Sequence, residues 1–117
     1  MSYDIQLFRL ETKDREQQCN DEHFFDDAEQ LEPFTEQQIA ELKDRLLGYD
    51  YELVRESPDG MEYRHAEYTI TVLLTERGLY FTAGWDTDSI FEAGMTASEF
   101  TDTDEFAKYD PQNGGWE

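Results

Sequence analysis

The acidic surplus is the feature that most constrains how this chain can fold. It carries 29 Asp and Glu against 9 Lys and Arg, giving a net charge of −20 over 117 residues. Self-repulsion of this size opposes a compact state, so a folded form needs a substantial apolar core. Eight Phe, seven Tyr and two Trp can supply it, since each buried aromatic removes a large apolar area from water. We therefore expect a single folded domain over residues 1–117, with fraying from about residue 112.

The composition also disfavours several classes of protein. Cys19 is the single cysteine, so no intramolecular disulfide can form. The N-terminus lacks the basic flank and apolar run of a signal peptide, and no stretch has the roughly 18 apolar residues of a membrane span. Anionic membranes and free nucleic acid would be repelled by this charge. We expect a cytoplasmic protein that binds neither of them.

The carboxylates are concentrated in two blocks. Residues 16–42 hold nine carboxylates and no Lys or Arg, and residues 86–117 hold nine more with only Lys108 in opposition. Between them, residues 69–85 carry one Glu and one Arg and are mostly apolar. Two interpretations of these blocks remain open: an acidic face for a basic partner, or a surface that only confers solubility.

Apolar alternation predicts strands at residues 2–9, 51–55, 61–65, 68–75 and 79–85. The connections between the last four are too short for parallel crossovers, so these strands form an antiparallel meander.

Residues 36–47 are predicted to form a helix, because Thr35 and Gln38 match a capping box and Gly48 ends the segment. Residues 11–33 are polar and interrupted, with a short helix possible near Phe24 to Leu31.

The predicted fold is α+β, an antiparallel sheet of four or five strands with one main helix packed on one face and short extra helices. A second capping-box match at residues 96–99 predicts that one of these short helices begins there and carries Phe100. Residues 106–109 fit either a helix or an edge strand. The expected core is Ile5, Leu7, Ile39, Leu42, Leu46, Leu53, Ile70, Val72, Leu74, Leu79, Phe81 and Phe100.

The sequence contains no catalytic motif and no recognisable metal site. Segments 86–88 and 102–104 both have the sequence Asp-Thr-Asp, which resembles the start of a calcium loop. Neither has the required Gly at position 6 or Glu at position 12. Cys19 and two His are too few for a familiar zinc site, and an acidic neighbourhood raises the pKa of a thiol and deactivates it. We predict no enzyme activity, metal or cofactor.

The two ends of the chain resemble small bacterial proteins of unknown role. The opening Met-Ser-Tyr-Asp-Ile and the stretch from Tyr109 to Gln112 with Gly114-Gly115-Trp116 are similar to such proteins. Several of these groups resemble immunity proteins of bacterial toxin systems. The resemblance implies a bacterial, cytoplasmic inhibitor and identifies no site residue.

Aromatic side chains surrounded by carboxylates are the best candidates for a binding site, because such anchors are typical of hot spots for basic partners. We expect a non-enzymatic protein that binds a basic protein, most concretely an immunity protein. Alternatives are a nucleic-acid mimic that inhibits a DNA-binding protein, a small enzyme, or an acidic protein with no specific partner. The expected partner-binding residues are Asp21, Glu22, Phe25, Asp26, Asp27, Glu29, Trp85, Asp86 and Asp88.

Overall fold

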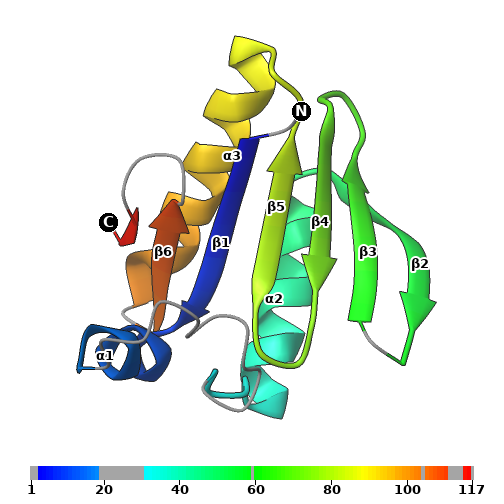
Figure 1. The fold of residues 1–117 in the computed structure, drawn as a ribbon. Coiled ribbons are helices and arrows are strands. Elements are labelled where there is room, and N and C mark those ends of the chain that lie inside the picture. Colours follow the sequence, from blue (N-terminus) through cyan, green and yellow to red (C-terminus); the bar gives the residue numbers. More distant parts are fainter. Residues whose placement is uncertain (1–2, 19–30, 59, 104, 111–114, 117) are drawn as a thin grey trace.

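The computed structural model describes residues 3–18, 31–58, 60–103, 105–110 and 115–116. Within them, seven strands form one antiparallel sheet in the order β2-β3-β4-β5-β1-β6-β7. The strands are β1 (Tyr3–Arg9), β2 (Tyr51–Ser57), β3 (Gly60–His65), β4 (Ile70–Leu74), β5 (Leu79–Ala83), β6 (Phe106–Asp110) and β7 (Gly115–Trp116). The helices are α1 (Leu10–Gln18), α2 (Glu36–Gly48) and α3 (Thr87–Phe100), followed by a 3-10 turn η3 (Thr101–Thr103). Helices α2 and α3 cover the same face of the sheet (Figure 1), which confirms the predicted α+β class.

Strands β2 to β5 form the predicted antiparallel meander. Alternate residues of β4 are buried, as expected for a strand with one face against the core. The β4–β5 turn is closed by Thr75, whose backbone N–H donates to the Gly78 carbonyl at 2.9 Å. The Thr75 hydroxyl in turn accepts a hydrogen bond from the Gly78 N–H at 3.0 Å.

Strand β1 lies inside the sheet and pairs antiparallel with both β5 and β6. Strands β5 and β6 therefore run parallel to each other, with β1 between them. Parallel strands need a long crossover connection, usually a helix. Helix α3 is that crossover, which explains why it packs against the sheet across β1 and β5 (Figure 1).

The sheet is larger than the four or five strands predicted, because the chain after α3 adds β6 and β7. Segment 106–109 lies in a strand, and β6 is an inner strand with neighbours on both sides. Its adjacent residues Phe106 and Ala107 are both buried, since the two faces of β6 are both covered. Buried faces remove the alternation that marks a strand in sequence. Of the stretch expected to fray from about residue 112, the structure describes Gly115 and Trp116, which pair with β6.

Helix α2 matches its prediction closely. The Thr35 hydroxyl accepts a hydrogen bond from the Gln38 N–H at 3.1 Å, and the Gln38 side chain accepts one from the Thr35 N–H at 2.9 Å. This reciprocal pair satisfies two backbone donors at the start of the helix. Leu42 and Leu46, one turn apart, are fully buried against the sheet.

Two helices differ from the sequence-based expectations. Helix α1 lies in the polar stretch 11–33, earlier than the short helix considered near Phe24 to Leu31, and Thr12 is its buried residue. Of the segment from Phe24 to Leu31, Leu31 alone is among the described residues. Helix α3 begins nine residues before the capping-box match at 96–99, with Asp86 as its N-cap. Thr96 is consequently buried within the helix rather than capping it. The inner face of α3 contains Ala93 and Ala97, whose small side chains give a weak apolar signal in the sequence.

The main core lies between the sheet and helices α2 and α3. Ten of the twelve expected core residues are buried, whereas Ile39 is only partly buried and Leu53 is 47% exposed. Leu53 is exposed because β2 is an edge strand in which only Tyr51 is buried. The buried aromatics Phe34, Tyr51 and Tyr63 complete this core.

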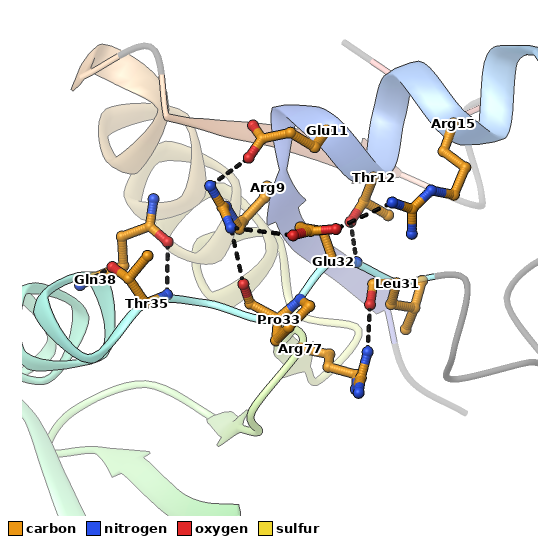
Figure 2. A network of polar contacts seen from close by, with 10 residues as sticks. All are labelled: Arg9, Glu11, Thr12, Arg15, Leu31, Glu32, Pro33, Thr35, Gln38 and Arg77. Carbon is orange, nitrogen blue, oxygen red and sulfur yellow. Dashed lines mark hydrogen bonds and ion pairs between the residues drawn. The ribbon is translucent and has the colours of Figure 1, made fainter.

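A network of polar contacts holds residues 31–35 against the rest of the molecule (Figure 2). The Arg9 guanidinium donates to the Pro33 carbonyl at 3.0 Å and pairs with Glu11 and Glu32. Arg15 pairs with Glu32 at 3.0 Å, and Arg77 donates to the Leu31 carbonyl at 2.7 Å.

Thr12 completes the network, because its hydroxyl accepts a hydrogen bond from the Glu32 N–H at 2.8 Å. Segment 31–35 leads into α2, so these contacts fix where that helix begins.

Thr12 offers a test of this arrangement, with the exposed Thr82 of β5 as a matched control. Thr12→Val removes the acceptor of the Glu32 N–H and should lower the free energy of unfolding by about 1–2 kcal/mol. Thr82→Val leaves the buried contacts unchanged and should alter the free energy of unfolding by less than about 0.5 kcal/mol. Urea denaturation of both variants measures these changes, and an equal loss in both would contradict the hydrogen-bond assignment.

Candidate protein-binding surface

The expected partner-binding residues fall into two groups. Asp21, Glu22, Phe25, Asp26, Asp27 and Glu29 lie outside the described residues, as do Cys19 and His23. Trp85, Asp86 and Asp88 lie together at the junction between β5 and α3. The structure therefore places one of the two groups, and it places that group at the start of the crossover helix.

Trp85 is a half-exposed aromatic side chain that also has a structural contact. Its indole is 53% exposed, and its ring packs edge-on against Tyr3 with the ring centroids 5.9 Å apart. Tyr3 is held in turn by a 2.7 Å hydrogen bond from its hydroxyl to the Asp110 carboxylate. Trp85 thus contacts Tyr3 while about half of its surface stays exposed to solvent.

Asp86 has a structural role as the N-cap of α3. Its carboxylate accepts a hydrogen bond from the Ser89 N–H at 2.9 Å, and hydrogen bonds from Ser89 lower the pKa of Asp86. Ser89 is itself buried, and its hydroxyl accepts a hydrogen bond from the Thr69 N–H at 3.0 Å. Asp88, in the first turn, is exposed and complements the positive end of the helix dipole.

The outer face of α3 carries two exposed apolar side chains that the sequence analysis missed. Phe91 is 68% exposed and Met95 is 38% exposed. They are four residues apart and so lie one turn apart on the same face of the helix. The opposite face, with Ala93, Ala97 and Phe100, is fully buried. The spacing of Phe91 and Met95 would have revealed this face once the helix was known to begin at Thr87.

The charge of this helix is negative. No Lys or Arg occurs anywhere in residues 78–107, whereas seven carboxylates do. Lys108 of β6 reaches the C-terminal half of the helix, where its ammonium donates to the Ser98 hydroxyl at 3.1 Å. Near the C-terminal end of α3, Arg45 pairs with Asp102 at 3.1 Å and lies over the Phe100 ring. No ion pair links a described basic residue to Asp88 or Glu92, nearer the start of the helix.

These residues form what we call the α3 surface, defined as Trp85, Asp88, Phe91, Glu92 and Met95. It combines exposed apolar side chains with two carboxylates, Asp88 and Glu92, that form no ion pair with a described basic residue.

His65 is held by the backbone of the residues that follow it. The Nδ1 atom of His65 accepts hydrogen bonds from the backbone N–H groups of Glu67 and Tyr68, at 3.0 and 3.2 Å. This nitrogen is therefore occupied, and the ring is packed between Tyr51 and Tyr68. Within the part of the chain that the structure describes, no three His, Cys, Asp or Glu side chains lie close enough to hold a metal ion.

A hollow of about 450 Å³ lies where the β2–β3 and β4–β5 turns meet residues Leu31 and Ile39. Tyr80 lines it, and burial raises the pKa of the Tyr80 hydroxyl. Glu56, Glu76 and Arg77 are the charged residues of its lining.

Comparisons with known proteins give no family assignment. The chain matches no protein-family model, no curated protein and no solved structure. Separately, no helix in the described residues is long and apolar enough to cross a membrane.

The capping role of Asp86 predicts a pH dependence of stability. Because the folded state lowers the pKa of Asp86, its contribution is fully present above the ordinary pKa of about 3.9 and is lost as the pH falls through the lowered value. Asp86→Ala should lower the melting temperature at pH 7, and the gap to the parent chain should narrow below about pH 4.

Asp86→Asn provides the control, because Asn also caps helices. The difference in melting temperature between the Asn and Ala variants should stay constant with pH, since neither side chain titrates. A gap between the parent chain and Asp86→Ala that does not change with pH would contradict the assigned role.

Proposed function

We propose that this chain is a non-enzymatic binding protein that engages a basic protein through acidic surface. The α3 surface carries the proposal. Phe91 is the most exposed of the large apolar side chains in the described residues, and it stands on a helix whose charged side chains are all acidic. An aromatic anchor with acidic neighbours fits a hot spot that a cationic surface covers.

Electrostatics supports a basic partner over a neutral one. A net charge of −20 creates a strong negative field, which accelerates the approach of a cationic protein and repels anionic ones. The carboxylates at Asp21, Glu22, Asp26, Asp27 and Glu29 add to this field, and their place in the contact stays a prediction from the sequence. Association should therefore be fast at low ionic strength and slow markedly as salt is added.

The concrete form of the proposal is an immunity protein that inhibits a bacterial toxin. A nuclease toxin must be basic around its active cleft to hold phosphates, so its cleft is a cationic surface that complements the acidic surface of this chain. The resemblance of the chain ends to small bacterial proteins agrees with this form. A cytoplasmic location also belongs to the proposal, because an inhibitor of this kind protects the cell from inside.

The first experiment identifies the partner. The immobilised chain is incubated with lysate of its source cells at low ionic strength, and bound proteins are eluted with a NaCl gradient. A captured basic protein is then expressed in a test host alone and together with the chain. We expect it to arrest growth alone and to be tolerated when the two are co-expressed.

Substitutions on the α3 surface test the contact itself. Phe91→Ala should raise the dissociation rate of the captured protein at least about tenfold, as expected for loss of a hot-spot anchor. The Asp88→Lys and Glu92→Lys double variant should mainly slow association and weaken its salt dependence. Surface plasmon resonance measures both rates.

Matched controls use residues of α2. Leu47 is 57% exposed, so Leu47→Ala removes comparable apolar surface, and the Glu41→Lys and Asp44→Lys double variant reverses two charges, as the α3 double variant does. Neither should change the rates as the α3 variants do. Equal effects of the α2 and α3 variants would overturn the proposed contact. If the captured protein is a DNA-binding protein that does not arrest growth, and duplex DNA displaces it from the chain, the chain mimics nucleic acid instead.

A further inference from the structure

Strand β2 forms an open edge of the sheet. In the described residues it pairs with β3 on one side and has no strand on the other. Residues Glu52 to Ser57 are all exposed, and the side chains of Leu53 and Val54 are 47% and 49% exposed. An exposed edge with apolar side chains is a template for a further strand. The other edge of the sheet is β7, which is only two residues long.

A β-bulge determines which side chains of β2 share a face. The pairing with β3 places Glu52 opposite Arg64 and Arg55 opposite Glu62, with the register shift between Leu53 and Arg55. Glu62 and Arg64 are two residues apart in β3 and so lie on the same face of the sheet. Glu52 and Arg55 therefore share that face too. In a regular strand, residues three apart would point to opposite faces.

We propose that two copies of this chain associate through β2, with the two strands antiparallel about a two-fold axis between Leu53 and Val54. In this register Glu52 of each copy lies opposite Arg55 of the other, and Leu53 lies opposite Val54. Such a two-fold interface repeats each contact twice. Opposite charges that face one another across two strands are stabilising.

The flanking β3 strands extend this complementarity. A row of four charged side chains then crosses the joined sheet. It begins with Arg64 and Glu52 of one copy and continues with Arg55 and Glu62 of the second copy, so that positive and negative charges alternate. Within each copy, the Arg55 and Glu62 side chains already form an ion pair at 3.3 Å. The bulge makes the ladder possible, because it brings Glu52 and Arg55 onto one face.

The charge of this edge also favours a second copy as the occupant. Strands β2 and β3 together carry three carboxylates and two guanidinium groups, so they are nearly neutral within a chain of net charge −20. Two such chains repel each other over most of their surface, and this edge is where they can approach with little repulsion. A strongly basic partner would be drawn instead to the more acidic α3 surface.

The test is sedimentation equilibrium of the full chain with two charge-reversal variants, E52R and R55E. The parent chain should show a monomer–dimer equilibrium that shifts toward dimer as NaCl is raised, because salt screens the overall repulsion. Each variant alone places like charges opposite each other and should weaken dimerisation at least about tenfold. An equimolar mixture restores opposite charges at both positions and should recover the dimer.

Lys13→Glu is the matched control, because it changes the net charge as R55E does but lies on α1. It should leave dimerisation at the parent level, and circular dichroism of each variant verifies folding. A parent chain that stays monomeric at all protein and salt concentrations would overturn the proposal. So would a mixture that dimerises no better than its components, or a Lys13→Glu variant as impaired as R55E. The α3 variants should dimerise normally, so the two proposals can fail separately.

Discussion

The pairing of β1 with both β5 and β6 is the constraint on which the rest of the fold depends. It joins the first residues of the chain to two strands that follow much later, and it fills the space between two parallel strands. Ile5 and Leu7 of β1 are buried in the main core, while Phe8 is buried on the opposite face. Because β1 separates β5 from β6, the chain must cross the sheet between them. Helix α3 lies across the sheet because it connects β5 to β6 on either side of β1.

The two faces of α3 differ in burial. The inner face must fit closely over β1, and it does so with Ala93 and Ala97, both fully buried. Ile5 of β1 lies beneath the helix, and a Cβ atom added at Gly94 would be in ordinary van der Waals contact with it at 3.7 Å. The outer face has no such requirement, since Phe91 and Met95 project into solvent. Their exposure does not stabilise the fold. For that reason we assign them to a contact with a partner in the functional proposal.

Several of the nine basic residues form contacts with other parts of the same chain. Arg9, Arg15 and Arg77 hold residues 31–35 (Figure 2), and Arg45 holds the turn after α3 through Asp102. These tethers join elements that are distant in sequence. Among the described residues, no basic side chain pairs with the carboxylates at the start of α3, whereas Arg55 and Arg64 make β2 and β3 nearly neutral. One charge distribution therefore underlies both proposed surfaces.

The sequence by itself determined the local features. The capping box of α2, the meander from β2 to β5 and most of the core could be predicted, since caps, turns and alternation act over a few residues. The tertiary structure decided the rest. It placed β1 between β5 and β6, made α3 one long helix and exposed Phe91 and Leu53. These outcomes depend on which strand lies beside which, and that pairing is set by contacts between distant residues that no short pattern encodes.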